Sequence, residues 1–270
     1  MQGPSRAAAA ASREAFTGVL AAGADRARLA EELFAVVGVI DGSATLRRAV
    51  ADPSREGAEK AQLAERLFAG KVSAEALVVL KGAFGQRWSS ERDLTDAIEA
   101  YAIESVIAHA EADDRADRVE DELFRFERIV AADPALRAAL TDTQAPADKR
   151  ADLVSSLLRD KVAPETLVLA RQAVVAPRGR RFDRVVEHYL ETASSRREQQ
   201  TATVTSAVPL TDEDRARLAA GLAAIYGGTV HVNTVVDPRV MGGIRVEIGD
   251  ELIDGTVIRK LDAARRAMGA

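Results

Sequence analysis

The chain of 270 residues contains no cysteine, and aromatic residues make up only 4% of it. The lack of cysteine excludes disulfide bonds, thiolate nucleophiles and cysteine-ligated zinc. No apolar stretch approaches the roughly 20 residues that cross a bilayer, and residues 1–16 lack the basic, leucine-rich pattern of a signal peptide. We therefore expect a protein that stays in the cytoplasm and builds its core from small aliphatic side chains.

Charge and glycine patterns exclude further classes of function. The net charge of −5 is spread over segments of mixed sign, so no basic stripe is available to bind a nucleic-acid backbone. The pairs Gly227-Gly228 and Gly242-Gly243 lack the spacing of phosphate-binding loops, and no GxSxG motif marks a nucleophile. The sequence thus predicts no catalytic residue and no cofactor.

The three histidines are poorly placed for catalysis or metal binding. His109, His188 and His231 lie in three different segments without HxH or HxxxH spacing. The acid-rich run from Glu111 to Glu122 lacks the glycine and the alternating oxygen ligands of a calcium loop. We interpret this run as a solvated loop and helix start, and we expect no metal site.

A repeat is the strongest positive feature of the chain. Residues 45–84 align with residues 135–174 at a constant offset of 90, with 13 identities in 40 positions. The same offset pairs residues 32–34 with residues 122–124, and an LxxAIExY motif ending at Tyr101 is matched by FxxVVExY ending at Tyr189. A unit of about 90 residues can close its own core, so the repeat predicts two helical bundles in tandem. A duplicated module is more typical of a connector than of a catalyst.

Helix-start signals agree between the two copies. Ser43 in the first copy corresponds to Asp133 in the second, and Ser73 corresponds to Ala163; a proline follows each residue of the second copy. Different residues that begin a helix at the same place favour a shared fold. No glycine or proline interrupts residues 101–112. We therefore expect the last helix of the first copy to continue into the first helix of the second.

The pattern changes beyond residue 192. Residues 193–200 are polar and are interpreted as a linker, after which alternating β-branched residues and turn signals predict a small α+β domain. We expect strands at residues 201–208, 230–236, 244–248 and 251–253, a helix that Thr211 caps, and a last helix over residues 256–268. The predicted fold is mainly α with a small α+β C-terminal domain, divided into residues 1–103, 104–195 and 196–270.

The turn from Pro177 to Arg181 carries three arginines. Clustered guanidinium groups can bind phosphate or carboxylate groups. The alternative, which we favour, is a loop between two helices whose charge serves solubility.

The densest motif lies near the C-terminus, where a DPxVxGGIxVExG stretch is followed by IDGT and, further on, KL. It resembles the C-terminal signature of the delta subunit of bacterial ATP synthase, whose mitochondrial counterpart is the oligomycin sensitivity-conferring protein. The resemblance covers about residues 178–270, including the stretch before the helix that Thr211 caps. The signature residues are Asp237, Pro238, Gly242, Gly243, Gly249, Asp254, Gly255 and Thr256.

The first helical copy departs from the ordinary family pattern, which has one six-helix domain. In this respect the chain is similar to the extended delta subunits of high-GC bacteria, and only 6 of its 37 basic residues are lysine, as such a genome favours. The resemblance implies a non-catalytic stator subunit of the proton-translocating ATP synthase. Such a subunit is present once in the complex and is peripheral at the cytoplasmic face of the cell membrane.

The resemblance also implies partners. In the family, the helical domain receives N-terminal segments of the alpha subunits in an apolar groove between its first and fifth helices, and the C-terminal domain holds the end of the b subunit. The corresponding groove residues would be Phe16, Val19, Leu20, Leu77, Leu80 and Phe84 in the first copy and Val106, Leu167, Ala170 and Val174 in the second. Ordinary core packing is the alternative role for each of them.

Two other functions stay open at this point. One is an enzyme in which Asp237, Asp250 and Asp254 converge as catalytic carboxylates, which would require a pocket and perturbed pKa values. The other is a helical adaptor of an unrelated complex, which the C-terminal signature disfavours.

Overall fold

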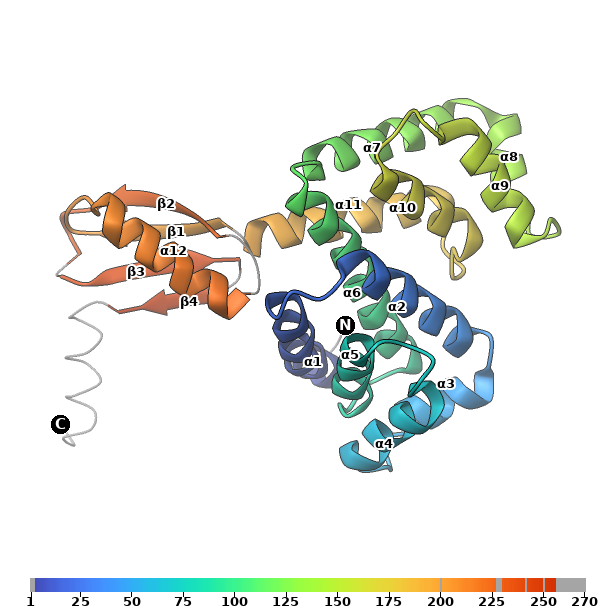
Figure 1. Cartoon of the computed structure of the whole chain (residues 1–270), viewed down its shortest axis with the longest axis horizontal. Coiled ribbons are helices and arrows are strands. Elements are labelled where there is room, and N and C mark those ends of the chain that lie inside the picture. The colour runs from blue at the N-terminus through green and yellow to red at the C-terminus, as the bar shows by residue number, and fades with distance from the viewer. Residues whose placement is uncertain (1–2, 200, 227–229, 241, 250, 256–270) are drawn as a thin grey trace. The chain divides into compact units, whose positions relative to one another are not determined.

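The computed structural model describes residues 3–199, 201–226, 230–240, 242–249 and 251–255. These residues form twelve helices and one four-stranded sheet, divided between two compact units, Met1–Ala193 and Ser194–Ala270 (Figure 1). The predicted fold class, mainly α with a small C-terminal α+β domain, is confirmed. The elements are α1 (Gly3–Ala21), α2 (Arg26–Asp41), α3 (Ala44–Ala51), α4 (Gly57–Phe68), α5 (Ala74–Phe84), α6 (Glu91–Ala112), α7 (Ala116–Ala132), α8 (Pro134–Thr141), α9 (Ala147–Leu158), α10 (Pro164–Val175), α11 (Phe182–Gln199), β1 (Thr201–Ser206), α12 (Asp212–Tyr226), β2 (His231–Val236), β3 (Ile244–Ile248) and β4 (Glu251–Asp254).

Helix α6 is shared by two bundles within the first unit. The first bundle comprises α1–α6, with α2 packed along α6 and α1 against α5; the second comprises α6–α11, with α10 against α7 and α9 (Figure 1). One continuous apolar core runs through both. The predicted continuity of this helix is confirmed, because α6 runs from Glu91 to Ala112 without a break.

The two bundles repeat a specific hydrogen bond. Oε2 of Glu32 on α2 accepts from the backbone N–H of Ser73 at 2.9 Å, and Oε2 of Glu122 on α7 accepts from the N–H of Ala163 at 2.8 Å. Both partner residues lie at the N-cap of the following helix, α5 or α10, where backbone donors lack an intrahelical acceptor. The repeat in sequence is therefore also a repeat in structure. In each bundle one glutamate, Glu32 or Glu122, binds the N-terminus of one helix, α5 or α10.

The predicted helix starts are confirmed in both bundles. Ser43 accepts from the N–H of Leu46 at the start of α3, and Asp133 accepts from the N–H of Leu136 at the start of α8. Ala163 has no side-chain acceptor, but proline at the first helical position lacks the donor that would need one.

The linker predicted at residues 193–200 is wrong for its described part, because α11 continues to Gln199. The segment is polar, but it contains no glycine or proline, and its arginine, glutamate, glutamine and alanine residues favour a helix. Strand β1 begins at Thr201.

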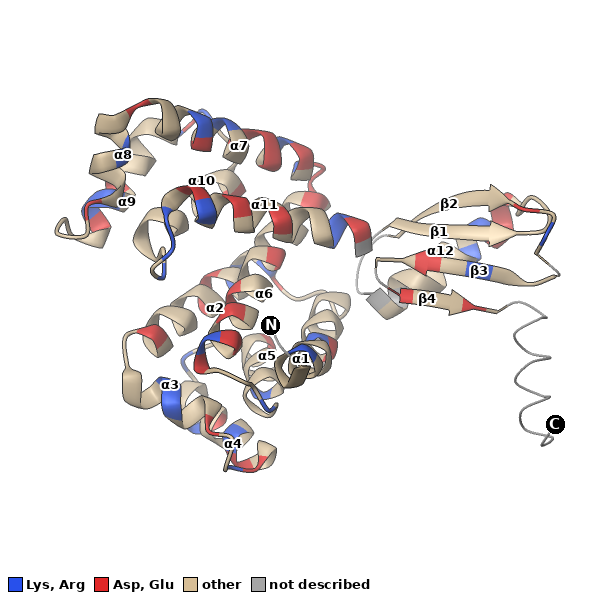
Figure 2. Ribbon diagram, turned by 180° about the vertical axis from the view of Figure 1, so that it is seen from behind, with Lys and Arg blue, Asp and Glu red and all other residues tan. Residues whose placement is uncertain are grey.

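Acidic and basic side chains alternate over the helices and form no basic stripe on the described residues (Figure 2). No helix in the described part of the chain is both long enough and apolar enough to cross a membrane.

The second unit is a mixed sheet of order β2-β1-β3-β4 with α12 against it (Figure 1). Strand β1 pairs parallel to β2 and antiparallel to β3, and β3 pairs antiparallel to β4. Alternate residues of β1, among them Ala202 and Val204, are buried with Leu222 of α12 and Val246 of β3. Thr211 accepts from the N–H of Asp214 at 3.1 Å, which confirms it as the cap of α12.

Candidate protein-docking surfaces

The predicted groove of the first bundle lies at the seam between α1 and α5. Phe16, Leu80 and Phe84 have no exposed surface, and the ring of Phe16 stacks on Tyr101 of α6 with a centroid distance of 4.7 Å. Val19 and Leu20 are also buried, whereas Leu77 is partly exposed. Five of these six side chains therefore belong to the core, and Leu77 is the one that a partner could contact directly.

A glycine makes this seam narrow. A Cβ atom on Gly82 of α5 would lie 2.7 Å from the Cβ atom of Ala15 on α1, closer than two carbon atoms can approach. The lack of a side chain thus lets the two helices pack closely. The corresponding position of the second bundle is Gln172, at the same offset of 90.

The seam of the second bundle joins α6 and α10. Val106, Ala170 and Val174 are buried there, and Leu167 is partly exposed. In both bundles the predicted groove residues form an apolar layer beneath one accessible leucine, Leu77 or Leu167. Their role in binding a partner stays a prediction.

An unexpected contact joins the bundles at the turn 177–181. The side chain of Arg178 is only 5% exposed and pairs with three carboxylates: Asp41 of α2, in the first bundle, at 2.5 Å, and Glu99 and Asp96 of the shared helix α6 at 2.6 Å and 2.8 Å. The neighbouring Arg180 also pairs with Glu99. We call this group the interlock. The turn is a loop between two helices, as we expect, and Arg181 is exposed. Our interpretation of its charge as serving solubility is wrong for Arg178 and Arg180, because these two arginines bind carboxylates of α2 and α6.

Electrostatics keep the interlock charged although it is buried. Burial alone would lower the pKa of Arg178, but the negative charges of Glu99, Asp41 and Asp96 raise it above its usual value. For His188 of α11, burial and the charge of Arg180 lower the pKa.

Four buried polar atoms near the interlock have no hydrogen-bond partner among the described residues: Oε1 of Glu99, Nη1 of Arg180, Nε2 of His188 and the hydroxyl of Tyr189. Burial raises the pKa of the Tyr189 hydroxyl, so it stays a neutral group.

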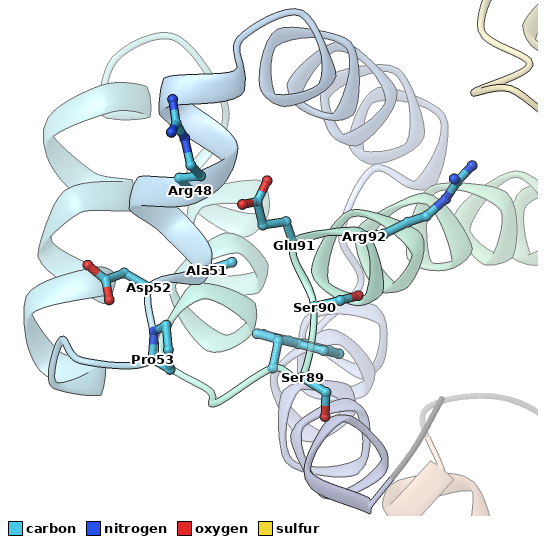
Figure 3. Close-up of a pocket in the computed structure, with 9 residues that line it drawn as sticks. Arg48, Ala51, Asp52, Pro53, Ser89, Ser90, Glu91 and Arg92 are labelled. Carbon is cyan, nitrogen blue, oxygen red and sulfur yellow. The ribbon is translucent and has the colours of Figure 1, made fainter.

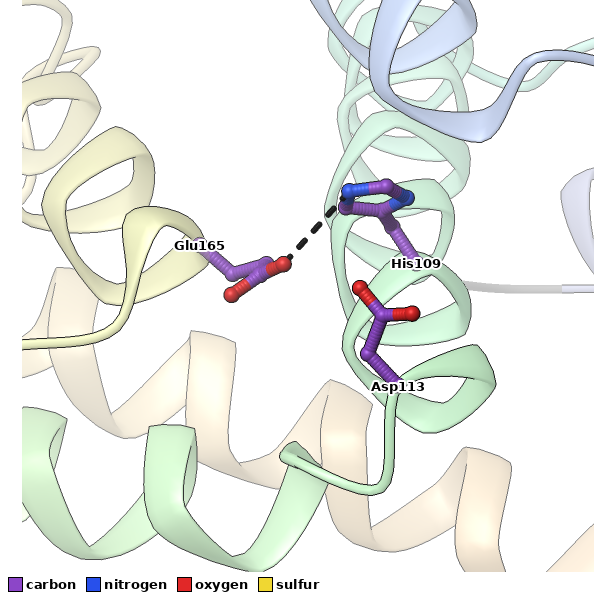
Figure 4. Close-up of side chains that lie close together, drawn as sticks. All are labelled: His109, Asp113 and Glu165. Atoms are coloured by element: carbon purple, nitrogen blue, oxygen red, sulfur yellow. Dashed lines mark ion pairs between the residues drawn. The ribbon is translucent and has the colours of Figure 1, made fainter.

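A second carboxylate cluster lies where α6 meets α10. Ligand atoms of His109, Asp113 and Glu165 lie within 4.8 Å of one another, and Nε2 of His109 is 3.5 Å from Oε1 of Glu165 (Figure 4). Arg115 donates to Glu165 at 2.6 Å and to Asp113 at 2.7 Å. Burial would raise the pKa of Glu165, but the hydrogen bond from Arg115 and the charge of that residue hold the pKa below its usual value. The arginine already occupies the position of a cation, so the cluster acts as a structural ion-pair network.

Each bundle also has a cleft at the end crossed by its last interhelical loop. In the first bundle this cleft has a volume of about 670 Å³ and lies between α3 and the residues that lead into α6 (Figure 3). In the second bundle it has about 820 Å³. Three residues of the first cleft, Arg48, Ala51 and Pro53, lie 90 positions before Ala138, Thr141 and Thr143 of the second.

The signature residues of the second unit shape turns. Asp237 follows β2, and its carboxylate accepts from the backbone N–H of Arg239 at 2.9 Å. Gly242, Gly243 and Gly249 adopt φ angles of 70°, 79° and 53°, which side chains disfavour.

The end of the signature closes β4. Gly255 donates its N–H to the carbonyl of Ile244 at 3.0 Å. Asp254 lies 3.6 Å from Arg245, and Pro238 follows β2 in the turn that begins at Asp237. Thr256, Asp250 and the predicted last helix lie outside the described residues.

The interlock was missed from the sequence because its charges are distant along the chain. Arg178 and Asp41 are separated by 137 positions, and nothing in either local pattern marks them as partners. One available signal was Glu99, an acid that the repeated LxxAIExY motif places next to its apolar residues and that Glu187 matches in the second copy.

Comparison with known proteins places these features in a family. The model of the family described as "ATP synthase delta (OSCP) subunit" matches residues 98–268, which is more than half of the chain. Proteins named "ATP synthase subunit delta" are similar over almost the whole length. The protein from Kineococcus radiotolerans is 46% identical over 98% of this chain and 97% of its own; those from Streptomyces griseus and Beutenbergia cavernae are 43% and 41% identical, each over 99% of both chains.

These alignments cover almost the whole of both chains, so the relatives include a segment equivalent to the first bundle. The family model begins at residue 98, inside α6, and covers the second bundle and the α+β unit. The chain belongs to the ATP synthase delta (OSCP) subunit family, whose members are non-catalytic subunits of an enzyme complex.

Proposed function

We propose that this chain is a stator subunit in the peripheral stalk of a proton-translocating ATP synthase, present once in the complex. It ties the catalytic head to the b subunit, so that rotor torque does not turn the head. The family supports the assignment to the complex. The position would be peripheral, on the cytoplasmic face of the membrane.

The observation that carries this proposal is the rigid union of the two bundles. Helix α6 belongs to both, and the interlock ties Arg178 of the second bundle to Asp41 of the first and to Glu99 of the shared helix. A connector under torque needs such a union, because a flexible joint would absorb rotation that the head must resist. Buried charge pairs fix one geometry, since each charge loses its compensation when the geometry changes.

We assign a separate contact to each part of the chain. Residues 1–103 and 104–195 would each receive an N-terminal segment of an alpha subunit along the α1–α5 or α6–α10 seam, where Leu77 and Leu167 are accessible. Residues 196–270 would hold the end of the b subunit. A standard interface of roughly 800 Å² per partner can support the nanomolar affinity of a stable stalk.

Affinity purification from native membranes tests this assignment. The tagged chain should recover an ATP-hydrolysing head and the b subunit. Leu77→Asp and Leu167→Asp place a charge on the two seams, and each should reduce recovery of the head while leaving b bound. Val39→Asp is the matched control, because Val39 is 55% exposed and lies on α2, which is not one of the helices that form the two seams. Full recovery of the head by the double seam variant would contradict the assignment.

The two alternatives considered from the sequence are excluded by the family. Its members are non-catalytic, so Asp237, Asp250 and Asp254 are not an enzyme's carboxylates. Asp237 instead holds Arg239 in an ion pair of 3.0 Å. The family equally excludes an adaptor of an unrelated complex.

A further inference from the structure

The four buried polar atoms beside the interlock that lack a hydrogen-bond partner among the described residues lie in one neighbourhood. Arg180 donates to Oε2 of Glu99 through Nη2, so the free Nη1 of Arg180 and the free Oε1 of Glu99 belong to one ion pair. The ring centroids of His188 and Tyr189 are 6.4 Å apart. The charges of Glu99 and Arg180 act on the pKa of both of these residues. The cluster therefore spans the turn 177–181, α6 and α11.

The matching tyrosine of the first bundle has direct partners. The hydroxyl of Tyr101 hydrogen-bonds to the hydroxyl of Ser12 at 2.7 Å and to the carbonyl oxygen of Ala9 at 3.2 Å. The offset of 90 places Ala102 at the position of Ser12 and Glu99 at the position of Ala9. In the second bundle, the position that supplies a hydroxyl to Tyr101 therefore holds a methyl group, and an acid is added next to it.

Burial makes these free atoms costly. Glu99 and Tyr189 have no exposed surface, and the four atoms themselves are inaccessible to bulk solvent. A buried polar group without a hydrogen bond raises the free energy of the folded state, and nearly all such groups in folded proteins bind protein atoms or ordered water. A ligand that satisfies these atoms has to be small, because the side chains around it are packed in the interior.

The mixture of donors and acceptors identifies the kind of ligand. Nη1 of Arg180 can only donate, and Oε1 of the Glu99 carboxylate can only accept. The Tyr189 hydroxyl can do both, and Nε2 of a neutral imidazole does one or the other according to the tautomer. A metal cation would be repelled by the guanidinium group, and an anion would be repelled by the carboxylate. A small neutral molecule that both donates and accepts suits all four atoms, and water is such a molecule.

We propose that internal water binds among Glu99, Arg180, His188 and Tyr189 and completes the interlock. The water accepts from Nη1 of Arg180, donates to Oε1 of Glu99 and hydrogen-bonds to the hydroxyl of Tyr189 and to Nε2 of His188, as a single molecule or as a short chain. It links α11 to the ion pairs between the turn and α6. The proposal concerns the interior of the helical unit and is independent of the stalk assignment.

Removal of the Tyr189 hydroxyl tests the proposal through the sign of its effect. If water binds the hydroxyl, Tyr189→Phe removes a hydrogen bond and should lower the melting temperature of the helical unit in the full chain by about 2–4 °C. If the hydroxyl has no partner at all, the same substitution removes an unsatisfied polar group and raises the melting temperature. An unchanged or raised melting temperature would therefore overturn the proposal.

Tyr101→Phe is the matched control, because it removes the same hydroxyl from the same motif in the first bundle. That hydroxyl has direct protein partners, so the melting temperature should fall. Under the proposal the two variants change in the same direction. A fall for Tyr101→Phe together with a rise for Tyr189→Phe would show that the second tyrosine binds nothing.

A crystal structure of the full chain, at a resolution that shows ordered water, locates the ligand directly. We expect a water molecule at about 2.7–3.2 Å from at least two of the four atoms. A direct hydrogen bond between Tyr189 and Glu99 with no water between them would overturn the proposal. None of these measurements involves another subunit, so failure of this site is distinguishable from failure of the stalk assignment.

Discussion

The Nε atom of Arg178 donates a hydrogen bond to Oδ2 of Asp41 at 2.5 Å, although the two residues are 137 positions apart. Asp41 is the last residue of α2 in the first bundle, and Arg178 lies in the turn before α11 in the second. The contact thus joins one segment of each bundle, and these two segments are far apart along the chain.

Arg178→Ala should destabilise the whole helical unit by about 3 kcal/mol, because buried Glu99 keeps only Arg180 as its cation and half-buried Asp41 loses the guanidinium group that pairs with it. Denaturation of the full chain by urea, followed by circular dichroism, measures this change. Arg181→Ala in the same turn is the control. Its side chain is 83% exposed, so we expect a change within about 0.5 kcal/mol. Equal effects of the two substitutions would show that the interlock adds no stability.

Gly82→Ala should cost about 1–3 kcal/mol, since the new methyl group would overlap Ala15 across the α1–α5 seam. The free energy of unfolding is the measurement. Gly38 offers the opposite case inside α2, because a Cβ atom there meets nothing within 4 Å. Gly38→Ala should therefore stabilise the chain by about 0.5–1 kcal/mol. If both substitutions stabilise, the seam is looser than the close approach of Gly82 and Ala15 indicates.

Stability should fall as the pH drops below about 4.5 because of Glu122. Burial raises the pKa of Glu122, but hydrogen bonds from Thr166, Ala163 and Arg118 outweigh it and hold the pKa below 4.5, the ordinary value. The unfolded chain therefore binds a proton more readily, and acid favours unfolding. The contribution is complete above about pH 4.5 and is lost as the pH falls through the lower pKa of the folded state.

Two variants check this assignment by urea denaturation between pH 7 and pH 3. Glu122→Gln should be less stable than the unmodified chain at pH 7, and the difference should shrink as the pH falls. Thr166→Val removes one donor to the carboxylate, so it should reduce the slope of stability with pH. An unchanged slope in both variants would assign the acid sensitivity to other groups.

Phe16→Ala should lower the free energy of unfolding by about 3–5 kcal/mol, because its ring is fully buried against Tyr101. Leu77→Ala should cost about 1 kcal/mol, since Leu77 is only partly buried. If the seam receives an alpha-subunit segment, the second substitution should weaken binding of the catalytic head by more than its small loss of stability explains. Thermal unfolding and affinity purification separate the two effects.

Local signals in the sequence were sufficient for most of the fold. Ser43 and Asp133 cap α3 and α8 as expected, because a cap depends on residues three positions apart. The hairpin of β3 and β4 follows from alternation around Gly249. By contrast, α11 extends through a polar stretch, since polarity alone does not end a helix when good helix formers compose it.

The burial of the groove residues and the contacts of the interlock could not be predicted from local sequence patterns. The burial of Phe16 and Phe84 depends on how closely α1 and α5 approach each other. This approach depends in turn on Gly82 of α5, which has no side chain to meet Ala15 of α1. Likewise, Trp88 donates to the carbonyl of Ala83 and Arg178 to Asp41, and both residues lie in loops without a regular periodicity that could predict these contacts.

Helix α6 gives the doubled module a mechanical property. Its 22 residues extend over about 33 Å as one rod, and this rod is a structural member of both bundles. A force on either bundle is transmitted to the other along the axis of α6, through its continuous series of backbone hydrogen bonds. Duplication has thus lengthened the protein without adding a hinge, because the second module begins before the first one has ended.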